Sequence, residues 1–182
     1  MEALEFYRGN RVDTAGRTLR DVLNFNRYQL EEVHDYIQWV FPLDVASGYN
    51  GKAPILSTAE IEAFQADTDV RSLVLEAFTM MLTFYGLRTE TVDGQLHVVR
   101  AETFRQRSAA WITRDNHNFL RLTRILSSMR LLGFGEHARA LLCCLEDLYP
   151  PHSVLIGRRT LDHWRSAVSG RPVSRAWGWL RW

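Results

Sequence analysis

The sequence predicts a mainly α-helical protein: a single irregular multi-helix globular domain of about seven or eight helices, with one small β-hairpin. Apolar residues recur at helical spacing through most of the 182 residues, and glycines and prolines fall at the ends of these periodic stretches. One segment, residues 87–100, instead carries β-branched residues around an Asp-Gly turn. Hydrophobic residues make up 46% and charged residues 24% of the chain, as in ordinary globular proteins.

The first predicted helices lie before residue 42. Thr18 is suited to cap a short helix that runs to Asn24. A longer helix is predicted from about Asn26 to Phe41, because its apolar residues have a clear helical period and Pro42 cannot continue it.

This longer helix carries more polar and aromatic side chains than a helix end requires. On a helical wheel His34 falls inside the apolar arc and Gln38 at its edge, whereas Trp39 lies on the opposite side. A helix with polar groups on its inner face and tryptophan on its outer face is expected to be covered on both sides.

The central part of the chain predicts two more helices and the hairpin. Ser57 and Glu60 form a capping-box pattern that starts a helix to about residue 66. The following helix, residues 67–85, is apolar over more than half of its circumference and is predicted to be the core helix, ended by Gly86. Further helices are predicted at residues 101–112, 116–132 and 136–149, the last stopped by Pro150 and Pro151, and in a stretch that ends at Gly170.

Composition excludes several functional classes. The formal charge of +1 provides no overall attraction to nucleic acid. No run approaches the roughly 18 apolar residues of a membrane span, and the start of the sequence does not have the pattern of a signal peptide, so a cytoplasmic protein is expected. The two cysteines are adjacent and no metal-binding spacing surrounds them, so neither a metal nor a cofactor is predicted.

The last twelve residues differ from the rest in composition. Residues 1–170 are predicted to form the helical domain and residues 171–182 an Arg/Trp-rich tail. This tail carries Arg171, Arg175, Arg181, Trp177, Trp179 and Trp182. It is suited to contact a membrane interface or a partner, or to fold back onto an apolar groove, and the last of these is favoured.

The predicted helix 116–132 carries a polar row. His117, Arg121, Arg124 and Ser128 follow one another at spacings of four, three and four, and leucines border the row. Two guanidiniums and an imidazole on one face are suited to hold a carboxylate or a phosphate. Alternatively, the arginines pair with acidic residues of neighbouring helices.

Five stretches carry a resemblance to a known family. They are Glu5–Arg8, His34–Leu43, Lys52–Pro54, Phe84–Gly86 and Asn116–Asn118, the last followed by Leu120–Leu126. In this order they resemble the opioid growth factor receptor conserved domain over about residues 3–148, and the chain is similar to compact stand-alone bacterial members. The resemblance implies a receptor-like role: animal members are described as receptors for met-enkephalin at the nucleus and nuclear envelope. It provides no assignment of ligand-binding or catalytic residues, and the Arg/Trp tail departs from the family pattern.

The leading hypothesis is a non-catalytic binding domain for a small anionic or peptide ligand, in a cleft between the helices 26–41 and 116–132. The predicted ligand-binding residues are His34, Gln38, Trp39, Asn116, His117, Asn118, Arg121 and Arg124. One alternative is an enzyme in which His34 and His117 act as acid and base while the two arginines anchor an anionic substrate. A second alternative is a protein-interaction module that uses the tail. The sequence does not determine the oligomeric state.

Overall fold

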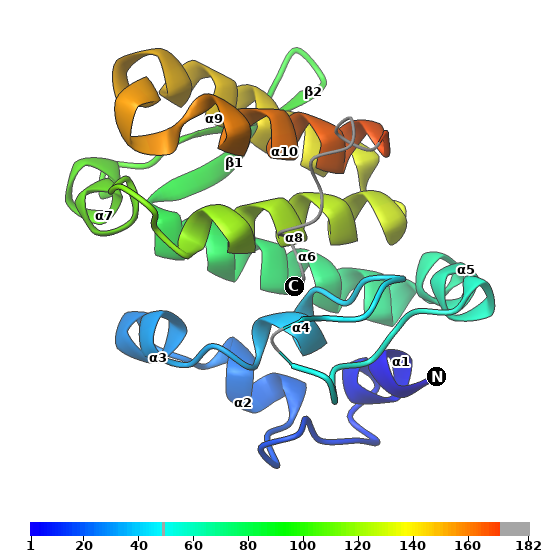
Figure 1. Ribbon diagram of the computed structural model, residues 1–182. Coiled ribbons are helices and arrows are strands. Elements are labelled where there is room, and N and C mark those ends of the chain that lie inside the picture. The colour runs from blue at the N-terminus through cyan, green and yellow to red at the C-terminus, as the bar shows by residue number, and fades with distance from the viewer. Residues whose placement is uncertain (49, 172–182) are drawn as a thin grey trace. The chain divides into compact units, whose positions relative to one another are not determined.

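The computed structural model describes residues 1–48 and 50–171 (Figure 1). They form two compact units: Met1–Met80 make up the first and the second begins at Met81, inside helix α6 (Thr68–Tyr85). The predicted class is confirmed, because these residues form helices and one two-stranded antiparallel sheet. They contain ten helices, more than the seven or eight predicted, and the first four have only six residues or fewer.

The first unit is built from short helices joined by ordered loops. It contains α1 (Glu2–Tyr7), α2 (Leu19–Leu23), α3 (Arg27–Glu32), α4 (Ile37–Val40), α5 (Thr58–Ala66) and the first part of α6. Capping boxes at Thr18 and Asn26 start α2 and α3, which is why such short helices are well defined. Helix α1 packs against α4 and α5, and the Tyr7 hydroxyl donates to the Val40 carbonyl at 2.5 Å.

The predicted continuous helix from Asn26 to Phe41 is wrong. The chain leaves the helical conformation at Val33, which is extended with φ −87° and ψ 124°, and becomes helical again at Ile37. Long-range and local hydrogen bonds stabilise this break: the Tyr36 hydroxyl donates to the Leu30 carbonyl at 3.2 Å, and Arg17 Nη2 donates to Asp35 Oδ1 at 2.7 Å.

The break also overturns the helical-wheel placement of two predicted site residues. His34, placed in the apolar arc by the wheel, is exposed. Trp39, placed on the outer face, is only 1% exposed. A wheel assumes one uninterrupted helix, so its angular positions after residue 33 do not apply to α4. The expectation that the tryptophan is covered is correct.

The Ser57–Glu60 pattern forms only half of the predicted capping box. Ser57 Oγ accepts a hydrogen bond from the Glu60 backbone N–H at 3.2 Å, as expected. The Glu60 carboxylate, which is 2% exposed as a residue, accepts instead from the Leu4 backbone N–H at 3.0 Å. Glu60 therefore satisfies an N-terminal N–H of α1, a helix that has no side-chain cap of its own.

The core helix and the hairpin are found where they were predicted. Helix α6 buries Val70, Val74, Ala77, Phe78, Met81, Leu82 and Tyr85. Gly86 follows with φ +77°, a conformation that glycine adopts without strain. Strands β1 (Leu87–Val92) and β2 (Gln95–Arg100) then pair antiparallel around Asp93 and Gly94.

The second unit continues with α7 (Phe104–Trp111), α8 (Asn118–Leu131), α9 (Gly135–Ile156) and α10 (Arg158–Ser169). Helix α9 packs against β2, α8 and α10, and α10 also packs against α8 (Figure 1). Two buried tryptophans tie the unit together through their indole N–H groups. Trp111 donates to the Tyr85 carbonyl and Trp164 to the Phe119 carbonyl, each at 3.1 Å.

The prediction that Pro150 and Pro151 stop a helix is wrong, because α9 continues through both to Ile156. A proline in a helix removes one backbone hydrogen bond and crowds the preceding turn. Here both prolines are exposed, whereas Leu145, Leu148 and Ile156 are buried on the inner face of the same helix. The packing of this apolar face outweighs the helix-breaking tendency of the two prolines.

Helix α10 ends as predicted, with Gly170 at φ +68°. The predictions for the Arg/Trp tail concern residues that, apart from Arg171, lie outside the described part of the chain. Among the described residues, no helix combines the length and the apolar character needed to cross a bilayer.

Candidate functional site

The loop between α1 and α2 is organised around the carboxylate of Asp13, whose side chain is fully buried. Asp13 Oδ1 accepts from the backbone N–H groups of Ala15 and Arg17, each at 2.9 Å, and Oδ2 accepts from Arg17 Nε at 2.6 Å. Because Arg17 also donates to Asp35, this carboxylate connects the loop to the break between α3 and α4.

Trp39 of α4 lies beneath this loop. Its ring contacts Phe6, with 5.4 Å between ring centroids, and the Arg11 guanidinium lies 5.8 Å from the ring centroid. The indole Nε1–H is buried, yet it has no hydrogen-bond partner among the described residues. Trp111 and Trp164, in contrast, both use this group. Leaving a buried donor unsatisfied costs about 1–3 kcal/mol, so the group is suited to an acceptor from outside the chain.

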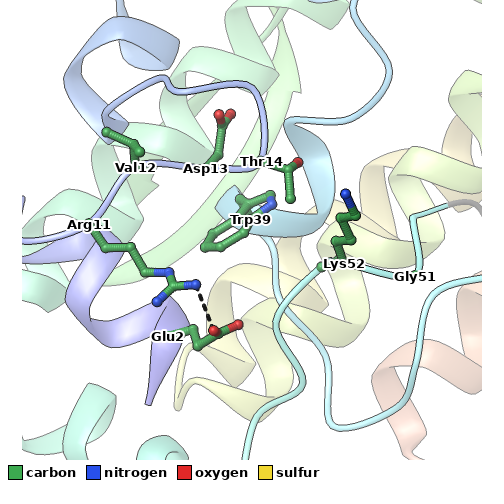
Figure 2. A pocket seen from close by; sticks show the side chains of 9 residues that line it. Glu2, Arg11, Val12, Asp13, Thr14, Trp39, Gly51 and Lys52 are labelled. Carbon is green, nitrogen blue, oxygen red and sulfur yellow. Dashed lines mark ion pairs between the residues drawn. The ribbon is translucent and has the colours of Figure 1, made fainter.

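A cavity of about 390 Å³ adjoins the Trp39 indole. It is lined by Glu2, Arg11, Val12, Asp13, Thr14, Trp39, Gly51, Lys52 and Ala53, all from the first unit. Figure 2 shows the indole ring in the middle of this lining, with its nitrogen on the side of Thr14 and Lys52 and with the Arg11–Glu2 pair on its other side. A volume of this size is typical of small-molecule sites.

The two carboxylates in the cavity lining already have partners. Glu2 Oε1 forms an ion pair with Arg11 Nη2 at 2.7 Å, and Asp13 is bound by Arg17 and by its own loop. Lys52 forms no ion pair with any described residue. The side of the cavity near the indole nitrogen therefore presents hydrogen-bond donors rather than acceptors.

A second polar cluster lies on α8. Three of the four residues in the predicted row are buried: Arg121 is 5% and Arg124 7% exposed, and Ser128 is fully buried, as is the neighbouring Asn118. Arg121 Nη1 donates to Asn118 Oδ1 at 3.3 Å. Burial lowers the pKa of Arg124 to about 10, because removing a guanidinium from water disfavours its charged form.

The residues before this helix have local structural roles. Asn116 Oδ1 accepts from the Asn118 backbone N–H at 2.9 Å, and its amide group donates to Thr113 Oγ1 at 2.8 Å. His117 is half-buried and is the residue that precedes the first helical residue of α8. Asn116 therefore shapes the entry to α8, although the N-cap position of this helix is His117.

The predicted site residues belong to two different units. His34, Gln38 and Trp39 lie in the first unit, and the residues from Asn116 to Arg124 lie in the second. The cleft expected between the two groups stays a prediction. Within the first unit, Gln38 resembles Trp39: it is 6% exposed, and its Oε1 has no partner among the described residues.

Sequence reasoning missed most of the cavity lining. Arg11 and Thr14 lie in a loop without a recognisable motif, and Glu2 is the first residue of α1, so no pattern in the sequence pointed to these three residues. Lys52 belongs to one of the stretches that resemble the family, but nothing in the sequence around it predicts a binding role. In the described part of the chain, no group of three His, Cys, Asp or Glu residues could hold a metal ion.

Comparison with known proteins provides the family context for these residues. The family model described as the opioid growth factor receptor (OGFr) conserved region matches residues 1–174. The chain is 37% identical to the opioid growth factor receptor of Rattus norvegicus over 92% of its own length and 29% of that protein. It is 39% identical to the receptor of Mus musculus over 80% of this chain and 23% of that protein. The chain is 40% identical to opioid growth factor receptor-like protein 1 of Mus musculus, over 58% of this chain and 22% of that protein. The chain thus spans less than a third of these relatives, and no solved structure matches it.

Proposed function

We propose that this chain, which belongs to the opioid growth factor receptor (OGFr) conserved-region family, is a non-catalytic binding domain for a small anionic or peptide ligand. The longer relatives are named as receptors, and the matched region covers less than a third of them. A receptor-like binding role is therefore proposed for this chain on the strength of its own site, with the family as context.

The single observation that carries the proposal is the buried indole N–H of Trp39. Trp39 lines a cavity of about 390 Å³, and its indole N–H has no acceptor among the described residues. Buried donors in native proteins are nearly always hydrogen-bonded, and a ligand acceptor in the cavity would satisfy this one. A ligand that binds here would gain a hydrogen bond shielded from water, together with contact to an aromatic ring.

Binding without chemistry fits the lining residues better than catalysis does. Among the nine described lining residues there is no histidine or cysteine, and both carboxylates have cationic partners. The enzyme hypothesis required His34 and His117 to share one pocket. His34 is exposed in the first unit and His117 belongs to the second, so no observation favours an acid–base pair.

The buried row of α8 is retained as a second anchoring surface in this proposal. Arg121 and Arg124 present two guanidiniums from one face, a group suited to bidentate contacts with carboxylates or phosphates. The Asn116–Asn118 stretch would position this surface by fixing the start of α8.

The test is a thermal-stability screen of the purified protein against short peptides and small organic anions. A ligand at 100 times its Kd is expected to stabilise the protein by about 2.7 kcal/mol. Trp39→Phe should abolish the stabilisation. Trp111→Phe is the matched control, because it also removes a buried indole N–H but lies in the second unit, and it should keep the response. A response that survives Trp39→Phe, or no response to any compound, would refute the proposal.

A further inference from the structure

On one side of the cavity lie two side-chain groups that can only donate hydrogen bonds, the buried Trp39 indole N–H and the charged Lys52 ammonium. The Trp39 indole has a donor and no acceptor, and the Lys52 ammonium has three donors and no acceptor. Figure 2 shows the indole nitrogen on the side of Lys52 and Thr14, whose hydroxyl adjusts to either role. A ligand group that enters here must therefore provide acceptor oxygens.

The two carboxylates among the described lining residues, Glu2 and Asp13, do not supply those acceptors. In Figure 2 the Asp13 carboxylate is turned away from Trp39, and three hydrogen bonds hold it within its own loop. Glu2 is joined to Arg11 at 2.7 Å, on the other side of the indole ring. Both lining carboxylates thus pair with other cations, so the indole N–H and the Lys52 ammonium can bind a ligand.

We infer that the ligand group bound in this cavity is a carboxylate, which accepts from the Trp39 indole N–H with one oxygen and from the Lys52 ammonium with the other. The inference rests on the proposed function and names the chemistry of that same site. The cavity volume of about 390 Å³ suits a small organic body attached to the carboxylate, either a free acid or the C-terminus of a peptide.

The charges of the lining favour a monoanion over a phosphate. Phosphate groups are typically held by several cationic or backbone donors, with arginine providing bidentate contacts. Arg11 is the only arginine among the described lining residues, and it already pairs with Glu2 and lies over the Trp39 ring. Lys52 is then the one lining cation without an ionic partner among the described residues, and a single ammonium balances a single carboxylate.

Lys52 also makes the inference unusually easy to test. It is the only lysine in the 182 residues, since 21 of the 22 basic side chains are arginines. Reductive methylation with ¹³C-formaldehyde therefore labels one side chain besides the α-amino group of Met1, and it preserves the positive charge. Labelling tryptophan with ¹⁵N adds the Trp39 indole N–H as a second reporter, identified with the Trp39→Phe variant.

The experiment titrates the doubly labelled protein with matched pairs of acid and amide. N-acetylleucine and N-acetylleucinamide form the first pair, and a tripeptide with a free or an amidated C-terminus forms the second. Inorganic phosphate is the third arm. We expect each acid to shift the Lys52 methyl and Trp39 indole signals, with the same Kd at the two reporters. Neither amide should shift either signal. A tighter Kd for one acid would identify the source as a free acid or a peptide C-terminus.

Substitutions then separate the contributions. Lys52→Met at this exposed position should weaken acid binding about tenfold or more, whereas Lys52→Arg should retain most of it, because a hydrogen bond to a charged group is worth roughly 1.5–3 kcal/mol. Glu2→Gln releases Arg11 from its ion pair and should strengthen acid binding. None of these three substitutions alters a buried side chain, so this comparison of acid binding does not depend on whether Trp39→Phe folds.

Three results would overturn the inference. The first is equal binding of acid and amide, the second is a response to phosphate that matches the acids, and the third is no response of the two reporters to any probe. The stability screen distinguishes this failure from failure of the proposed function. If that screen finds a ligand that requires Trp39 while the acids leave both reporters unmoved, only the carboxylate inference fails.

Discussion

Asp13→Ala is expected to destabilise the protein by about 3 kcal/mol, because the carboxylate is the centre of the loop that covers Trp39. The side chain is fully buried and accepts three hydrogen bonds of 2.6–2.9 Å, two from backbone N–H groups and one from the Arg17 guanidinium. Removing it leaves these donors without their acceptor, and Arg17 keeps only its bond to Asp35.

The size of this loss in stability depends on how far water can replace the hydrogen bonds of the missing carboxylate. Removing one partner of a buried ion pair typically costs about 3–5 kcal/mol. The low end applies here, because Arg17 is 18% exposed and keeps a second carboxylate partner, and because Ala15 is exposed, so that water can reach its N–H. The same loop carries Arg11 and Thr14 into the cavity lining, so the variant should also lose binding of any cavity ligand.

Urea titration at 25 °C, followed by circular dichroism, measures the free energy of unfolding. The matched control is Arg20→Ala. The Arg20–Glu76 pair has the same 2.6 Å distance as the Arg17–Asp13 pair, but its side chains are 60% and 47% exposed. Exposed pairs contribute about 0–1 kcal/mol, so this variant should be nearly neutral. Equal effects of Asp13→Ala and Arg20→Ala would refute the reasoning, because burial would then not distinguish the two pairs.

Two further predictions concern a glycine and a tyrosine. Gly86→Ala should destabilise the protein by about 2 kcal/mol more than Gly94→Ala. Both glycines have φ +77°, so the backbone strain is the same in the two variants. A Cβ on Gly86 would lie 2.7 Å from Phe104 Cα, whereas a Cβ on Gly94 would have no atom within 4 Å. Equal losses in thermal unfolding would contradict this. Burial raises the pKa of Tyr7 far above its usual value near 10, so the folded state keeps the proton that the unfolded state loses. The free energy of unfolding should therefore fall as pH rises above 10, and Tyr7→Phe should reduce that fall in urea titrations at pH 9 and 11.

The elements that follow from local signals could be predicted from the sequence. Helix α6, its end at Gly86 and the hairpin around Asp93 and Gly94 depend on hydrophobic periodicity and on glycine conformations, both of which act within a few residues. Helix α9 shows the limit of local reasoning. Pro150 and Pro151 are strong local stop signals, but contacts with β2, α8 and α10 keep the chain helical beyond them.

The candidate site depends on interactions that no local pattern reveals. Gln38 and Trp39 were predicted as site residues, and both carry a buried polar atom without a partner among the described residues. The wheel nevertheless placed Trp39 on the wrong face and His34 in the core. Both errors have one cause, the break before α4, in which Arg17 binds Asp35 across 18 positions of sequence.

This break explains why Trp39 lines the cavity. A continuous helix would direct Trp39 outward, as the wheel predicted. Because the chain restarts its helix at Ile37, the indole instead faces inward, beneath the loop that Asp13 and Arg17 hold in place. The Arg17 guanidinium thus binds both Asp13, in the loop that lines the cavity, and Asp35, in the break that orients Trp39. A change at Arg17, which is not among the described cavity-lining residues, should therefore alter the shape of the cavity.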